Sequence, residues 1–102
     1  MKVVMSDRAL AYLQSEQAYL AAFDKRAARA FVHQLKSAAK LIGQYPQAGV
    51  VAEPAKGVRR YVSAPYQIDY ILGDDLVIIA AIRHGRQNPR DVDDELSDGT
   101  EL

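Results

Sequence analysis

The sequence predicts an α+β fold with the element order β-α-α-β-β-β, in which an N-terminal helical hairpin packs on one face of a small, mainly antiparallel sheet. Three observations predict this fold. A short β-prone stretch opens the chain, two stretches with helical apolar spacing follow, and three strand-like stretches separated by turn residues come after residue 57. The length of 102 residues corresponds to one domain. We expect this domain to span residues 1–90.

The first strand and the first helix meet at Ser6. The stretch "KVVM", residues 2–5, favours a strand, and a serine directly after it can accept hydrogen bonds from free backbone N–H groups at a helix start. From Asp7 onward, apolar residues recur at helical spacings: Leu10, Leu13 and Leu20, joined by Tyr12 and Tyr19. Asp24 then has the side chain expected of a cap for a second helix.

The second helix has the clearest pattern in the chain. Its apolar stripe steps by three and four residues through Ala28, Phe31, Leu35, Ala38 and Ile42. Gly43 suits the left-handed position at a helix end, and Pro46 prevents continuation. Because the link between the two helices is short, we expect an antiparallel helical hairpin.

Residues 46–57 are rich in proline and glycine and predict a connection without a strand. Three strands follow, with the sequences "VRRYVSA", "YQIDYIL" and "LVIIAAIR", and the residues "GDD" between the second and third predict a hairpin turn. The last strand is apolar on both faces. This pattern predicts an interior strand that is covered on both sides.

Side chains alternate along a strand, so the last strand has two faces. One carries Leu76, Ile78, Ala80 and Ile82, and the other carries Val77, Ile79, Ala81 and Arg83. If the first set packs on the helices, Arg83 points into the open face of the sheet. That face is then too apolar to remain bare, and we expect a partner to cover part of it or a groove to form on it.

The open face is also predicted to carry a basic patch. Neighbours in a strand diverge, so only one of Arg59 and Arg60 reaches this face, and we take Arg60. The remaining candidates for this binding surface are Tyr61, Tyr66, Arg83, His84 and Arg86. Arginine binds phosphates and carboxylates with both of its nitrogens, which suits nucleic acid or an acidic protein segment. In the alternative interpretation, these arginines pair with Asp69, Asp74, Asp75 or the C-terminal tail.

We assign no residue to catalysis from the sequence alone. His84 beside arginines could transfer protons in phosphodiester cleavage, with Arg60 and Arg83 stabilising the transition state; alternatively, it closes a turn as a structural histidine. The chain has no cysteine, which excludes disulfides and thiolate chemistry. It has no glycine-rich phosphate loop and no convincing metal-ligand spacing, so we expect neither a cofactor nor a metal.

The neutral net charge hides an asymmetry. Residues 1–90 hold all thirteen Lys and Arg but seven acids, a balance of +6, whereas residues 91–102 carry six acids and no base. We expect these last residues to be an acidic tail that is either disordered or an interaction segment. The longest apolar run, residues 76–82, is too short to span a membrane, and residues 1–10 do not resemble a signal peptide. The sequence therefore predicts a cytoplasmic protein.

With these elements in place, residues 2–89 resemble a ParE-type toxin of the RelE/ParE superfamily of bacterial type II toxin–antitoxin systems. The resemblance is carried by "SDRALAYL", "AARAFVHQLKSAAKLIGQYPQAG", "GVRRYVSAPYQIDYIL" and "DDLVIIAAIRHGRQNP". It implies the fold given above and a cognate antitoxin, ParD-like or another small DNA-binding protein, whose C-terminal segment wraps the toxin in a hetero-oligomer. We expect that segment to present a helix and a strand to a groove between the helical hairpin and the sheet.

The resemblance implies two cellular targets. ParE members poison DNA gyrase and RelE members cut mRNA in the ribosome, with growth arrest or plasmid stabilisation as the outcome. RelE enzymes carry several lysines before the last strands and a basic, tyrosine-bearing helix after them. Here "AEPAKG" holds only Lys56, and the chain ends in "DVDDELSDGTEL". Both departures favour a gyrase inhibitor that acts by binding. The alternatives are a ribosome-dependent mRNA endonuclease and a degenerate, non-toxic relative that only binds the antitoxin.

Overall fold

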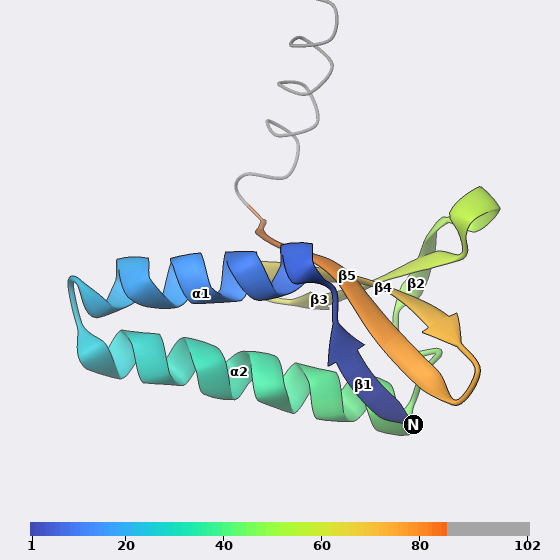
Figure 1. Ribbon diagram of the computed structural model, residues 1–102, viewed down its shortest axis with the longest axis horizontal. Helices are drawn as coiled ribbons and strands as arrows, with labels where there is room; N and C mark the ends of the chain where they lie inside the picture. Colours follow the sequence, from blue (N-terminus) through green and yellow to red (C-terminus); the bar gives the residue numbers. More distant parts are fainter. Residues whose placement is uncertain (86–102) are drawn as a thin grey trace, which may run out of the picture.

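Two helices and a five-stranded sheet make up residues 1–85, the part of the chain that the computed structural model describes (Figure 1). The elements are β1 (Lys2–Met5), α1 (Asp7–Ala21), α2 (Lys25–Gln44), β2 (Val50–Glu53), a 3-10 turn (Pro54–Lys56), β3 (Val58–Ser63), β4 (Tyr66–Gly73) and β5 (Leu76–His84). The sheet has the order β1-β5-β4-β3-β2, with β1 parallel to β5 and every other pair antiparallel. The predicted α+β class is confirmed.

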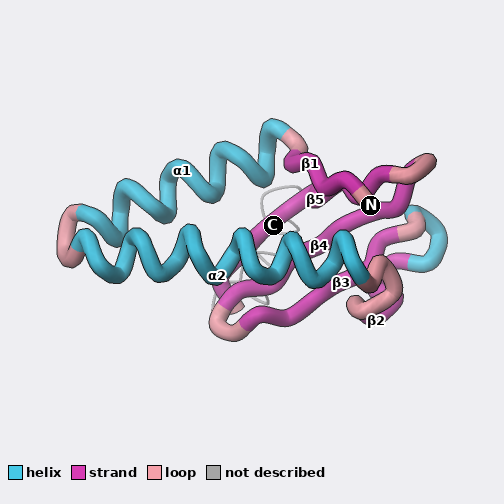
Figure 2. The backbone as a smooth tube through the Cα atoms, turned by 90° about the horizontal axis from the view of Figure 1, so that it is seen from below, coloured by secondary structure: helices cyan, strands magenta, loops and turns pink. Residues whose placement is uncertain are grey.

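The helical hairpin forms as predicted. Ser6 caps α1, its side-chain oxygen accepting from the Ala9 amide, and Asp24 caps α2 by accepting from the Arg26 amide. The two helices run side by side and in opposite directions (Figures 1 and 2). Arg86 and the acidic tail, residues 91–102, lie outside the described residues, and so does the predicted domain limit at residue 90.

Gly43 does not end the second helix in a left-handed conformation, contrary to the prediction. It lies inside α2, which continues to Gln44. The position requires glycine because β1 passes closely: a Cβ here would lie 2.9 Å from the Met1 carbonyl oxygen and 3.0 Å from Val3 Cγ2. The glycine therefore marks a contact between α2 and the first strand.

The region predicted as a plain connection contains an additional strand. Residues 50–53 form β2, which pairs with β3 at one edge of the sheet, with Val50 opposite Arg60 and Val51 opposite Arg59. Proline and glycine flank this strand on both sides and hide it from sequence patterns. Gly57, with φ 69°, then occupies a left-handed position that glycine adopts without strain. The element order is thus β-α-α-β-β-β-β.

The last strand contains a bulge that the sequence does not reveal. Asp69 of β4 is paired with Ala81 and Tyr70 with Ile79, so Ala80 is skipped in the register. An extra residue reverses the side-chain alternation. Odd-numbered residues of β5 therefore face the helices before the bulge, and even-numbered residues face them after it. Val77 and Ile79 face the helices before the bulge, and Ile82 faces them after it. The predicted face assignment of β5 is therefore wrong for its first half.

The core fills the space between the hairpin and one face of the sheet. Its helix side chains are Ala9, Phe31, Leu35, Ala38 and Ile42, and its strand side chains are Tyr66, Ile68, Tyr70, Val77, Ile79 and Ile82. The other face, which we call the open face, carries Leu76 and Ile78 as half-buried residues. Within residues 1–85 no helix covers the open face (Figure 2). The expectation that β5 is covered on both sides is therefore not met by these residues.

Candidate functional site

Two arginines and one aspartate form a charged cluster on the open face. Arg60 donates from Nε to Asp69 Oδ1 at 2.7 Å and from Nη2 to Oδ2 at 3.1 Å. Arg83 reaches the same Oδ2 through Nη2 at 3.3 Å. Asp69 is 5% exposed, so a buried carboxylate lies between two guanidinium groups. We call this group the Arg60–Asp69–Arg83 cluster.

The sheet register brings the three side chains together. Arg60 of β3 is directly opposite Asp69 of β4, and Asp69 is opposite Ala81 of β5, so these positions share a face. Arg83, two residues beyond Ala81, shares this face as well. With unbroken alternation from the core residues Val77 and Ile79, Arg83 would point toward the helices. The bulge at Ala80 therefore creates the cluster.

Ser6 connects this bulge to the first helix. Its backbone amide donates to the Ile79 carbonyl oxygen at 2.9 Å, and its hydroxyl donates to the Ala80 carbonyl oxygen at 2.9 Å. The same hydroxyl oxygen accepts from the Ala9 amide at 3.0 Å. One side chain thus caps α1 and binds the residue that the register skips, which links the helix start to the geometry of the cluster.

The cluster carries more positive than negative charge. One carboxylate faces two guanidinium groups, whose side chains keep 27% of their surface exposed at Arg60 and 20% at Arg83. Hydrogen bonding to Asp69 raises the pKa of Arg60, against the opposing effect of burial. The sequence left open whether the arginines bind a partner or pair with a carboxylate of the chain. In the structure both pair with Asp69, and their role in binding stays a prediction.

Three other predicted site residues, Arg59, Tyr61 and Tyr66, lie on the helix side of the sheet. Arg59 is opposite Tyr70 and donates from Nη1 to the Gly49 carbonyl oxygen at 2.8 Å. Tyr61 packs against the core, and Tyr66 is buried there, donating to Glu16 Oε2 at 2.7 Å. Tyr61 and Tyr66, predicted to lie near the arginines, are on the opposite face of the sheet, because side chains alternate along β3 and along β4.

His84 is separated from the arginines in the same way. It is opposite Tyr66 in the register, while its neighbour Arg83 is opposite Gln67 on the other face. Its ring meets the Tyr66 ring edge-on, with centroids 5.3 Å apart. The set proposed for phosphodiester cleavage, His84 with Arg60 and Arg83, is therefore divided between the two faces of the sheet.

Exposed valines flank the cluster, and sequence reasoning missed them. Val62 is two residues beyond Arg60 on β3 and is 59% exposed; Val50 of β2 is opposite Arg60 and is 69% exposed. Two apolar side chains with this much surface in water beside a partly buried ion pair are a common feature of binding surfaces. The signal was hidden because β2 itself was not predicted.

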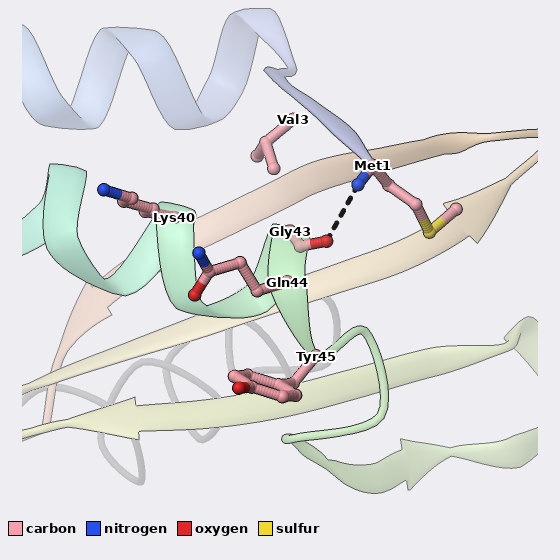
Figure 3. Close-up of a pocket in the computed structure, with 6 residues that line it drawn as sticks. All are labelled: Met1, Val3, Lys40, Gly43, Gln44 and Tyr45. Carbon is pink, nitrogen blue, oxygen red and sulfur yellow. Dashed lines mark hydrogen bonds between the residues drawn. The ribbon is translucent and has the colours of Figure 1, made fainter.

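A separate pocket of about 490 Å³ lies where α2 ends beside β1 (Figure 3). Its lining residues are Met1, Val3, Lys40, Gly43, Gln44 and Tyr45. The Met1 amine donates to the Gly43 carbonyl oxygen at 2.9 Å, which places a positive charge at the negative end of the helix dipole. This junction between hairpin and sheet is built from elements other than those of the cluster.

The described residues contain neither a metal-binding cluster nor a membrane-spanning helix. No group of three His, Cys, Asp or Glu side chains able to hold a metal ion occurs within residues 1–85. Among the same residues, neither helix has the length and apolar composition needed to cross a membrane.

Comparison with known proteins gives three results. The sequence model of the family described as "ParE toxin of type II toxin-antitoxin system, parDE" matches residues 3–89. The protein named "Toxin RelE2" from Caulobacter vibrioides is 39% identical over 83 residues, which cover 81% of this chain and 93% of that protein. A solved structure titled "Chromosomal ParDE TA system from P. aeruginosa" superposes with a TM-score of 0.69 at 17% identity, covering 82% of this chain and 95% of the other. The last result supports the fold alone.

Proposed function

Because the chain belongs to the ParE toxin family of type II toxin–antitoxin systems, we propose that it arrests growth by binding DNA gyrase until a cognate antitoxin covers it. The family implies an antitoxin partner. We propose in addition that the target is gyrase and that the toxin acts by binding, not by hydrolysis.

The Arg60–Asp69–Arg83 cluster is the observation that supports binding in place of RNA cleavage. A ribonuclease uses arginines to stabilise charge on a phosphate in the transition state, so their donors must be available to that phosphate. Here the buried Asp69 carboxylate accepts from both arginines, so it occupies donors that a phosphate in the transition state would need. An arginine pair that is already occupied by a carboxylate suits recognition of a protein surface better than catalysis on RNA.

The position of His84 supports the same conclusion. A proton-transfer group must lie within hydrogen-bond reach of the reacting atoms. His84 packs edge-on against Tyr66 on the helix side of the sheet, whereas both arginines lie on the open face. A single phosphate on the open face would contact the arginines and not this imidazole.

We propose that the antitoxin covers the open face around the cluster. Val50 and Val62 offer apolar anchors on both sides of Arg60, and the partly exposed guanidinium groups of Arg60 and Arg83 offer hydrogen-bond donors on the same face. A segment that combines apolar side chains with a carboxylate fits this surface, since apolar anchors carry most of the affinity and charges set register and association rate. The groove predicted between hairpin and sheet remains a second location for the same segment.

A ribosome-dependent mRNA endonuclease is the second candidate function. It is favoured by the 39% identical relative, whose name is Toxin RelE2. The two candidates differ in what is inhibited first in the cell: replication through gyrase, or translation through cleaved mRNA.

The test begins with co-purification of the chain and the protein encoded beside it, followed by release of the toxin and a gyrase supercoiling assay. We expect the free toxin to inhibit supercoiling and the antitoxin to restore it. The double variant Arg60→Ala/Val62→Ala should weaken antitoxin binding by at least tenfold, because it removes a charged anchor and an apolar anchor. Lys56→Ala is the matched control, since Lys56 is highly exposed and forms only a surface ion pair with Glu53.

Two results would contradict the proposal. Unimpaired supercoiling at a toxin concentration that arrests growth would exclude gyrase, and mRNA cleaved within ribosomes would establish the endonuclease. If cleavage occurs, His84→Ala decides whether this histidine transfers the proton. A folded chain that is harmless without its antitoxin would identify a non-toxic relative.

A further inference from the structure

The outer surface of α2 carries basic side chains and no acidic ones. Of the twenty residues in α2, five are Lys or Arg and none is Asp or Glu. These five and His33 are all exposed, and we call them the α2 basic stripe: Lys25, Arg26, Arg29, His33, Lys36 and Lys40. The proposed function uses none of them.

Helical spacing aligns the stripe along one side of the helix. From Arg26 to Lys40 the steps are three, four, three and four residues, which return to the same side of an α-helix. At 100° per residue the six side chains fall within an arc of roughly 100° and extend over ~22 Å of helix axis. The stripe is therefore a continuous row of five Lys and Arg side chains with one histidine among them.

The stripe has no visible role in holding the fold together. The core face of α2, with Phe31, Leu35 and Ile42, points toward the sheet, so the stripe points to solvent. None of the ion pairs formed among residues 1–85 involves an α2 side chain. Like charges three and four residues apart destabilise a helix by repulsion, so this arrangement has a cost that binding to an anion would offset.

The surface around the stripe favours a phosphate backbone over other anionic partners. Protein interfaces depend on aromatic or apolar anchors that enter pockets. The other exposed residues of α2 are Ala30, Ser37 and Gln44, and the exposed aromatic side chains of Phe23 and Tyr45 lie beyond the two ends of the helix. Membrane-surface helices insert an apolar face into lipid, whereas the apolar face of α2 is buried in the core. A row of Lys and Arg on a convex helix is sufficient to contact a phosphate backbone, because such binding is mainly electrostatic.

We propose that the α2 basic stripe binds the phosphate backbone of a nucleic acid, with little dependence on base sequence. This interaction is independent of gyrase inhibition and of the Arg60–Asp69–Arg83 cluster. It would keep the toxin close to nucleic acid, whether DNA or RNA, while the open face of the sheet engages a protein.

The experiment measures fluorescence anisotropy of a labelled 20-base-pair duplex with the purified full-length toxin, over a series of salt concentrations. DNA and RNA duplexes are compared. The test variant is Arg29→Gln/Lys36→Gln/Lys40→Gln, and the matched control is Lys2→Gln/Arg8→Gln/Lys56→Gln, which removes three exposed cations from other elements. Thermal unfolding verifies that both variants are folded.

For the unmodified chain we expect dissociation constants of about 10⁻⁴ to 10⁻⁶ M near physiological salt, as for other non-specific binders. The test variant should bind at least tenfold more weakly, and its slope of log affinity against log salt should fall by about three, one for each cation removed. The control should stay within about threefold of the unmodified chain. Similar affinity for both duplexes would indicate recognition of the backbone alone, and a clear preference would identify which nucleic acid is bound.

Three results would overturn the proposal. The first is no binding by the unmodified chain at ~50 mM salt, where electrostatic binding is strong. The second is an equal loss of affinity in both variants, which would assign binding to net charge and not to the stripe. The third is competition by poly-glutamate as effective as competition by unlabelled duplex, which would indicate an acidic protein as the partner.

Discussion

At the residue scale, Asp69 has the largest influence on the candidate site. It is a buried carboxylate shared by two arginines, so its removal takes from each partly buried guanidinium group its ion pair with Asp69. Losing one partner of such a group is costly, because the remaining charge was desolvated on folding. The arginines retain some exposure to water, which lowers this cost below that of a fully buried pair.

We therefore predict that Asp69→Asn lowers the free energy of unfolding by about 1–3 kcal/mol. Urea unfolding at equilibrium measures the change. Glu53→Gln serves as the matched control, because its exposed ion pair with Lys56, at 3.5 Å, should contribute less than about 0.5 kcal/mol. Equal effects of the two substitutions would contradict the interpretation that the cluster holds the sheet face together.

The pH dependence of this contribution follows from the raised pKa of Arg60. A group whose pKa is raised on folding stabilises the protein fully below its unfolded value and loses that contribution only as pH rises through the folded value. For arginine both values lie above the range in which proteins are studied. Titration of Arg60 should therefore leave the stability unchanged from neutral to moderately alkaline pH.

Part of the site could be predicted residue by residue. Alternation along β3 restricts Arg59 and Arg60 to opposite faces, and Arg60 does lie on the open face. The choice between them was not determined by the sequence, because it depends on which residue of β4 lies opposite. The pairing with Asp69 was foreseen only as one alternative, since strand register is a long-range property.

At the element scale, the predicted position of Arg83 on β5 is correct, but the side-chain alternation used to predict it is wrong. Strict alternation predicted Arg83 on the open face by assigning Leu76 and Ile78 to the core. The bulge at Ala80 gives the same position to Arg83 while Val77 and Ile79 form the core. Residues 76–82 of β5 are all apolar, so no polar side chain before Arg83 reveals such a shift in register.

Ser6 is hydrogen-bonded to the bulge, which leads to a second stability prediction. Ser6→Ala removes both the cap of α1 and the hydrogen bond to the Ala80 carbonyl oxygen. Each is worth about 1 kcal/mol, so we expect a loss of about 1–3 kcal/mol in the free energy of unfolding. Asp24→Ala, which removes the exposed cap of α2, should cost only about 1 kcal/mol.

A second readout separates the two roles of Ser6. In nuclear magnetic resonance spectra, Ser6→Ala should shift the amide signals of Ile79, Ala81 and Arg83, whereas Asp24→Ala should leave them unchanged. Unchanged signals in both variants would mean that Ser6 acts only as a helix cap.

At the scale of the whole molecule, the two proposed binding surfaces lie on opposite sides. The core fixes this arrangement, because one face of the sheet and the apolar face of α2 are both buried in it. Figure 2 shows α2 lying over one face of the sheet. Because the apolar face of α2 is buried against that sheet face, the exposed basic stripe and the open face lie on opposite sides of the molecule. A ligand on one surface need not touch the other.

This geometry predicts that a toxin bound to its antitoxin still binds nucleic acid through α2. The measurement adds the toxin-binding segment of the antitoxin, as a synthetic peptide without any DNA-binding part, to the toxin and the labelled duplex. At a saturating peptide concentration, the affinity for the duplex should change less than about threefold, because binding at independent sites has a coupling free energy close to zero. Displacement of the duplex by the peptide would mean that the two ligands share a surface. The peptide would then bind over the helical hairpin, and the open face of the sheet would need another partner.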